Sequence, residues 1–79
     1  MTERELGRTL VGLDVAHVHA ALDTLAPEHR EAVVLRYVEG MSYEEIAPVV
    51  GAPVGTVRSR LHHAKRALRA VLERTARDD

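Results

Sequence analysis

Basic and polar side chains are concentrated in one stretch near the C-terminus. The cationic side chains there are Arg58, Arg60, Lys65, Arg66 and Arg69. No Asp or Glu occurs from residue 46 to residue 72. Arginine can donate two hydrogen bonds to guanine, serine can contact either base type, and cationic side chains attract phosphates. The stretch therefore indicates contact with duplex DNA.

The charge of the chain is distributed unevenly, although its net value is only −1. Residues 1–45 carry nine acids and four arginines, whereas residues 46–79 carry seven Lys or Arg and three acids. A local cationic patch matters more for phosphate binding than the net charge. The alternative is a basic helix face that is merely solvated.

The cationic stretch follows the signals of two helices joined by a tight turn. Ser42 can cap the first helix, and Glu45 three residues later completes a capping box. Gly51 suits the left-handed residue after a helix, and Pro53 cannot continue that helix. A second helix is expected from about Val54. A short helix, a glycine-containing turn and a basic second helix are typical of a helix-turn-helix.

The apolar residues of this motif predict which faces are buried. Met41 and Ile46 are spaced for a hydrophobic staple. We expect Ile46, Val49 and Val50 to pack inward and to hold the first helix despite Pro48 in its interior. Apolar residues at steps of three and four predict the inward stripe of the second helix; they are Val57, Leu61, Ala64, Leu68 and either Val71 or Leu72.

Two further helices are expected before the motif. Asp14 can cap a helix from about Val15 to Leu25, and Pro27 fits the first position of a helix that runs to about Glu39. Gly40 can close that helix. The residues expected to be buried are Val15, Val18, Leu22 and Leu25 in the first helix, and Ala32, Val34, Leu35 and Val38 in the second.

These elements predict a small all-α domain of four helices with a C-terminal helix-turn-helix, of winged-helix-like type. We expect residues 15–74 to form the domain, residues 75–79 a polar tail, and residues 1–14 a linker or flexible N-terminal segment. Leu6, Leu10 and Leu13 could mark a short helix there, but Gly7 and Gly12 weaken it.

Composition argues against other classes of function. The 79 residues contain no Cys, which removes disulfides, thiol catalysis and Cys-type zinc sites. His17 and His19 cannot together bind one metal ion from a single helix face, and neither can His62 and His63. No catalytic pattern, cofactor motif, signal peptide or membrane span is apparent. We therefore expect a cytoplasmic protein that is not an enzyme, with no cofactor and no metal.

Two runs of the sequence resemble region 4 of bacterial RNA polymerase sigma factors. They are LAPEHREAVVLRYVEGMSYEEIA from Leu25 and GAPVGTVRSRLHHAKRAL from Gly51. Within the sigma-70 family the chain is most similar to the extracytoplasmic function (ECF) group. The resemblance covers roughly residues 15–73, and PVGTVRSR is its most specific part.

The resemblance implies a sequence-specific reader of the −35 promoter element in duplex DNA, acting as part of a sigma factor in transcription initiation. It also implies docking on the β-subunit flap of RNA polymerase and, commonly, binding by an anti-sigma factor. The family's DNA-contact positions correspond to Arg36, Tyr43, Glu44, Arg58, Ser59, His62 and His63, with Arg60 and Lys65 alongside. Thr56 lies at the N-terminus of the recognition helix, where free amides favour a phosphate.

The chain departs from the family pattern at two positions. His63 stands where arginine is common, and Pro48 replaces a usual helix former. Region 2, which melts the −10 element, is not among these residues. We therefore expect either a piece of a longer sigma factor or a region 4 with another use. The alternatives left open are a module bound mainly by an anti-sigma factor or the polymerase flap, and a response-regulator output domain.

Overall fold

The computed structural model describes residues 2–12 and 15–77, and every regular element in them is helical. This confirms the prediction of a small all-α domain. The elements are α1 (Glu3–Gly12), α2 (Val15–Asp23), α3 (Pro27–Val33), the π-helical turn η1 (Val34–Val38), α4 (Tyr43–Val50) and α5 (Val54–Arg77). None of the helices in the described part of the chain is both long and apolar enough to cross a membrane.

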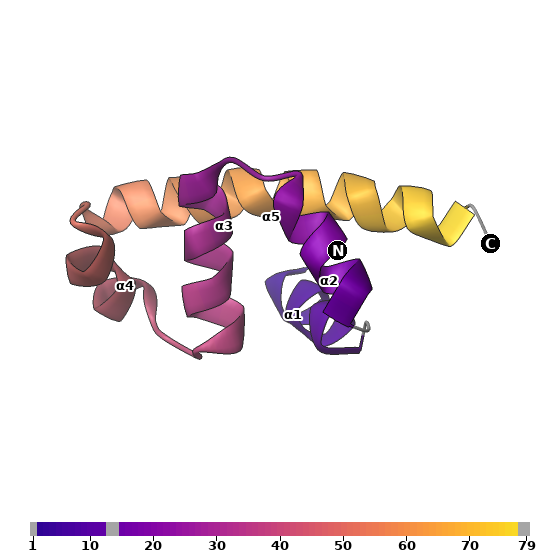
Figure 1. The fold of residues 1–79 in the computed structure, drawn as a ribbon. Coiled ribbons are helices and arrows are strands. Elements are labelled where there is room, and N and C mark those ends of the chain that lie inside the picture. The colour runs from indigo at the N-terminus through magenta and orange to yellow at the C-terminus, as the bar shows by residue number, and fades with distance from the viewer. Residues whose placement is uncertain (1, 13–14, 78–79) are drawn as a thin grey trace.

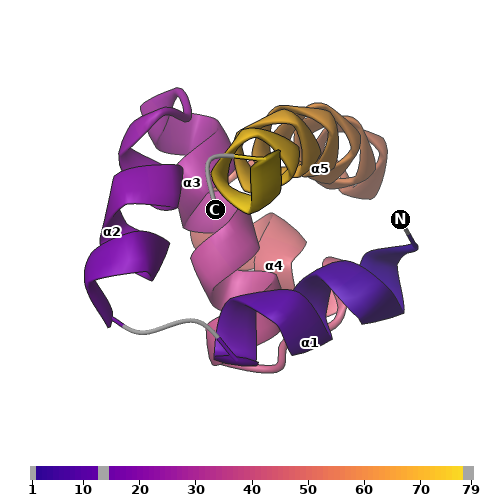
Figure 2. The ribbon, with the colours of Figure 1, turned by 90° about the vertical axis from the view of Figure 1, so that its right-hand side faces the viewer.

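Helix α5 runs along the whole length of the molecule, and the other helices lie on one side of it (Figure 1). Its 24 residues account for about 36 Å, close to the longest dimension of 40 Å. Helix α4 lies at its N-terminal end. Seen along α5, helices α2 and α3 lie on one flank and α1 on another (Figure 2). One face of α5 is thus left uncovered.

The core is aliphatic and is centred on the covered face of α5. Four residues of α5 are buried as predicted, namely Val57, Leu61, Ala64 and Leu68. They meet buried residues of every other α-helix, namely Leu6, Ala21, Ala32, Val33, Ile46 and Ala47, with Leu25 from the α2–α3 connection. The spacing of apolar residues by three and four positions in the sequence therefore correctly predicted which side of α5 is buried.

The boundaries of the helix-turn-helix agree with the sequence signals. The Ser42 backbone amide donates to the Glu45 carboxylate at 2.9 Å, and the Glu45 amide donates to Ser42 Oγ at 3.1 Å. Gly51 ends α4 with a φ of +68°, a left-handed conformation in which an L side chain is strained. The capping box therefore defines where α4 begins, and Gly51 defines where α4 ends and the turn to α5 follows.

Pro48 does not interrupt α4, which continues through it to Val50. The expectation that Val49 packs inward is wrong, because its side chain is 61% exposed. Ile46 and Ala47 are the buried residues, and Val50 is half-buried. Positions 46, 49 and 50 lie within one stripe of a helix, but the inward side of α4 is centred on Ile46, Ala47 and Val50, which leaves Val49 outside it.

The expected helix from Pro27 to Glu39 changes type after Val33. In η1 the Glu39 amide donates to the Val34 carbonyl at 3.0 Å, a bond that spans five residues. This wider turn rotates the following residues away from a 3.6-residue pattern. Val38 was expected to be buried but is 69% exposed. Gly40 follows with a φ of +72°, as a helix-ending glycine should.

An N-terminal helix, α1, adds a fifth α-helix to the four that were expected. Leu6 is fully buried in the common core, so this part of the chain packs as an element of the domain. A Cβ added to Gly7 would lie 3.0 Å from the Tyr37 ring. The close approach explains why a glycine is tolerated inside this helix. At the other end, α5 extends to Arg77, three residues beyond the expected limit.

Candidate nucleic-acid interface

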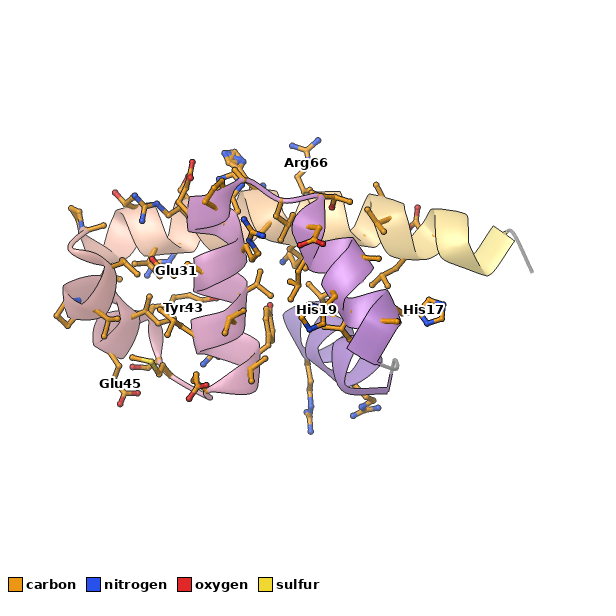
Figure 3. All side chains as sticks on the ribbon, in the orientation of Figure 1. His17, His19, Glu31, Tyr43, Glu45 and Arg66 are labelled. Atoms are coloured by element: carbon orange, nitrogen blue, oxygen red, sulfur yellow. The ribbon has the colours of Figure 1, made fainter. Side chains whose placement is uncertain are left out.

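The uncovered face of α5 carries four of the predicted contact residues. Arg58, Ser59, His62 and His63 are all exposed. Arg66 is exposed on the same helix and points away from the other helices (Figure 3). Because the buried stripe faces inward, these side chains share the opposite surface. They form a polar, cationic face near the N-terminal half of a helix, which suits entry into a major groove.

Tyr43, the first residue of α4, joins this face to the preceding elements. Two arginines lie near its ring: the Arg36 guanidinium carbon is 5.2 Å and the Arg58 guanidinium carbon 6.0 Å from the ring centroid. Cations at such distances over an aromatic face are attracted by its quadrupole. The capping box at Ser42 fixes where α4 begins, and so fixes the position of Tyr43.

Arg36 also has a local structural role. Its Nη1 donates to the Met41 carbonyl at 2.9 Å, across the turn between η1 and α4. The side chain is half-buried. The Arg36 side chain therefore connects the turn after η1 with Tyr43. It also places a positive charge at the edge of the uncovered face of α5.

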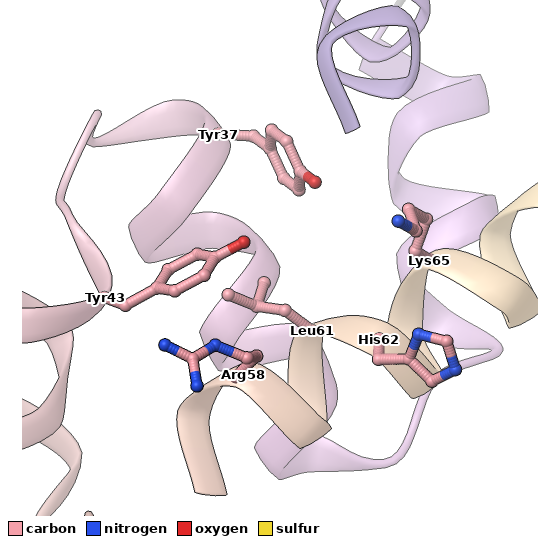
Figure 4. Close-up of a pocket in the computed structure, with 6 residues that line it drawn as sticks. All are labelled: Tyr37, Tyr43, Arg58, Leu61, His62 and Lys65. Carbon is pink, nitrogen blue, oxygen red and sulfur yellow. The ribbon is translucent and has the colours of Figure 1, made fainter. Parts of the chain in front are cut away.

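A pocket of about 110 Å³ lies beside this face (Figure 4). Its lining comes from three elements, with Tyr37 from η1, Tyr43 from α4, and Arg58, Leu61, His62 and Lys65 from α5. Arg58 and Lys65 are seven residues apart, two helical turns, and so lie on one side of α5. Tyr37 was not among the predicted contacts, since it reaches the pocket only through packing between distant segments.

Three histidines lie close together where α3 approaches α5. The His63 ring centroid is 5.9 Å from that of His29 and 5.8 Å from that of His62. The adjacency of His62 and His63 was visible in the sequence, but the approach of His29 was not. Within the described residues no group of three or more His, Cys, Asp or Glu side chains is placed to hold a metal ion.

Six of the ten predicted residues do not line the pocket, namely Arg36, Glu44, Thr56, Ser59, Arg60 and His63. Arg60 and Thr56 are half-buried, and each is two residues from Arg58 and therefore on a different side of α5. Glu44 is exposed in the first turn of α4. The structure thus gathers Tyr43, Arg58, His62 and Lys65 around the pocket and leaves the other six predicted residues outside its lining.

Little negative charge opposes the cations of α5. The one acidic residue in its described part, Glu73, lies near the C-terminal end and pairs with Arg69 at 3.1 Å. Both partners of this pair are more than half exposed, so the pair contributes little to stability. The positive charge of the N-terminal half therefore stays available to a ligand.

Comparison with known proteins identifies relatives of this fold and surface. The family model described as Sigma-70, region 4 matches residues 17–68. The ECF RNA polymerase sigma factor SigE of Mycolicibacterium smegmatis is 54% identical over 57 residues, which is 72% of this chain and 22% of the relative.

Two further relatives give the same result. The RNA polymerase sigma-H factor of Pseudomonas aeruginosa is 44% identical over 63 residues, 80% of this chain and 33% of the relative. The ECF RNA polymerase sigma-E factor of Escherichia coli is 45% identical over 51 residues, 65% of this chain and 27% of the relative. The match thus spans a third or less of each of these relatives.

Proposed function

Because this chain belongs to the Sigma-70, region 4 family, we propose that it binds the −35 promoter element as duplex DNA, as part of an RNA polymerase sigma factor. The observation that carries the proposal is the uncovered face of α5, with Arg58, Ser59 and His62 exposed together. A single helix lying in the major groove presents such a face to base edges.

The proposal assigns each residue a role according to the chemistry of its side chain. Arg58 and Ser59 lie in the first turns of α5 and read base edges, since Arg can bind guanine O6 and N7 together. Lys65 and Arg36 contact phosphates, which gives affinity without sequence preference. Tyr43, whose ring lies near both Arg36 and Arg58, orients both guanidinium groups. Glu44 accepts from a cytosine amino group at the edge of the site.

The partners of the whole factor are part of the same proposal. RNA polymerase, through its β-subunit flap, positions the domain on the promoter, and an anti-sigma factor competes for it. Two large apolar side chains on the surface, Val38 and Val49, support a protein partner. They lie on η1 and α4. Protein binding is therefore the second candidate function.

Selection of binding sites from random duplex DNA tests the proposal. Wild-type protein should enrich one short motif. Arg58→Ala should weaken the enrichment at one or two base pairs of that motif, whereas Arg4→Ala, an exposed arginine of α1, should enrich the wild-type motif. Failure of wild-type protein to enrich any motif would contradict sequence-specific binding and would favour the protein-interaction alternative.

A further inference from the structure

The pocket beside α5 has the composition of an anion site. The six residues that line it include two cationic side chains, two phenols and no carboxylate. The Tyr37 and Tyr43 hydroxyls both point into it, and the Lys65 side chain lies across from them (Figure 4). Leu61 supplies an apolar wall. Phenol hydroxyls and ammonium groups are donors that proteins use for phosphate oxygens.

The size of the pocket limits what can enter it. The pocket has a volume of about 110 Å³, and a single phosphate group fits in it. The pocket adjoins Arg58 and His62 of the uncovered face, so a DNA strand that follows this face passes the mouth of the pocket.

Helix α1 packs against the ring of Tyr37. The backbone of Gly7 lies so close that a Cβ there would be 3.0 Å from Tyr37 Cδ1 and 3.4 Å from Cε1. The neighbouring Leu6 is fully buried and anchors α1 to the core. The Tyr37 ring is therefore held from behind by α1 while its hydroxyl faces the pocket.

We propose that Tyr37, Tyr43 and Lys65 form a site for one backbone phosphate of the bound DNA, and that Gly7 of α1 positions Tyr37 in it. This inference rests on the proposed function and adds to it a residue and an element that the recognition helix alone does not supply. Lys65 contributes the charge, and the two phenols contribute directed hydrogen bonds.

The test uses the selected duplex in a series of copies, each with one neutral methylphosphonate linkage in place of a phosphate. Wild-type protein should lose affinity most at one position of one strand. Tyr37→Phe keeps the ring that packs on Gly7 and removes only the hydroxyl. It should bind the unmodified duplex about tenfold more weakly, as expected for a lost hydrogen bond to a charged group.

Tyr37→Phe and wild type should have equal affinity for the duplex that carries the neutral linkage at that position. The hydrogen bond from the Tyr37 hydroxyl to that phosphate is already absent there. The salt dependence of Tyr37→Phe should match wild type, since no charge is lost, whereas Lys65→Met should flatten the salt slope by about one. Unfolding midpoints in urea confirm that each variant is folded.

Gly7→Ala tests the positioning by α1, and Gly12→Ala is its matched control. Both changes add one methyl group to the same helix, but no atom lies within 4 Å of a Cβ at Gly12. Gly7→Ala should weaken binding and should add little to the loss caused by Tyr37→Phe. Gly12→Ala should bind as wild type does.

Two results would overturn the inference while leaving the proposed function intact. One is equal affinity of wild type and Tyr37→Phe for the unmodified duplex. The other is a loss for Tyr37→Phe that has the same size on every methylphosphonate duplex. If wild-type protein binds no duplex, the proposed function and this inference fail together.

Discussion

At the scale of single residues, Tyr43 could be identified from the sequence as a candidate site residue, whereas Tyr37 could not. The resemblance to region 4 indicated Tyr43, Arg58 and Lys65, and the structure places all three around one pocket. Tyr37 and His29 could not be found in this way, because their neighbours come from segments far away along the chain. The roles of all the proposed contact residues in DNA binding remain predictions.

His63 should make DNA binding depend on pH near neutrality. An imidazole gains its charge within the range from about pH 8 to pH 5, and a nearby phosphate favours the charged form. A group that binds its proton more tightly in the complex adds affinity at low pH, and this gain is lost as the pH rises. Affinity should therefore increase as the pH falls from about 8 to 6.

The measurement is the affinity of wild type and His63→Arg across that range at fixed salt. The variant should lose most of the pH dependence and bind at least as well at pH 8. His29→Gln is the control for the ring 5.9 Å away, and it should keep the wild-type slope. An unchanged slope in His63→Arg would exclude His63 as a phosphate contact.

Glu45 should make the stability of the fold depend on pH in acid. The hydrogen bond from the Ser42 backbone, aided by the one with the Ser42 side chain, holds the pKa of Glu45 below its ordinary value. A carboxylate with a lowered pKa in the folded state stabilises the fold above the ordinary pKa. This stabilisation is lost as the pH falls through the folded-state value.

Urea midpoints at pH 7 and pH 3 test this expectation. Glu45→Gln can still accept the backbone bond but cannot ionise, so its midpoint should change less between the two pH values than that of wild type. Glu39→Gln, an exposed carboxylate outside α4, should behave as wild type. A pH dependence of Glu45→Gln equal to that of wild type would contradict a role for the ionised cap.

At the scale of the elements, the capping box predicted the start of α4 and periodicity predicted the buried side of α5, whereas Asp14, the expected cap of α2, lies outside the described residues. The sequence did not predict η1, because a 3.6-residue pattern assumes that each amide bonds four residues back, and one turn here bonds five back. Val38 was misplaced for this reason. Val49 was misplaced because the inward side of α4 is rotated toward Ala47 and away from Val49.

Leu61→Ala tests the rotation of α5. The side chain is 5% exposed, and truncating a buried leucine leaves a cavity that costs about 2–5 kcal/mol. Arg66→Ala, on the exposed side of the same helix, should cost less than about 0.5 kcal/mol. Similar urea midpoints for the two variants would mean that the inward face of α5 has been assigned wrongly.

At the scale of the whole molecule, α5 is the element on which all the others pack, and α1 is one of them. The sequence suggested a linker over residues 1–14 because Gly7 and Gly12 lower helix propensity. Burial of Leu6 and the close contact of Gly7 with Tyr37 outweigh that propensity. Propensity describes a segment by itself, and tertiary packing of this kind is not contained in it.

Leu6→Ala should therefore destabilise the entire domain. A fully buried leucine predicts a loss of about 2–5 kcal/mol in the free energy of unfolding. Arg8→Ala, exposed on the same helix, should stay within about 0.5 kcal/mol of wild type. Equal stability of Leu6→Ala and wild type would show that α1 is not part of the cooperative fold.

The most direct test of the account is the affinity of wild type, Arg58→Ala and Lys65→Ala for the selected duplex and for copies with single base pairs replaced. We expect Arg58→Ala to lose about 1–3 kcal/mol on the selected duplex and to lose its preference at one base pair. Lys65→Ala should weaken binding to all duplexes by one factor. If Arg58→Ala also lost the same factor on every duplex, α5 would not read bases through Arg58, and the central claim would be contradicted.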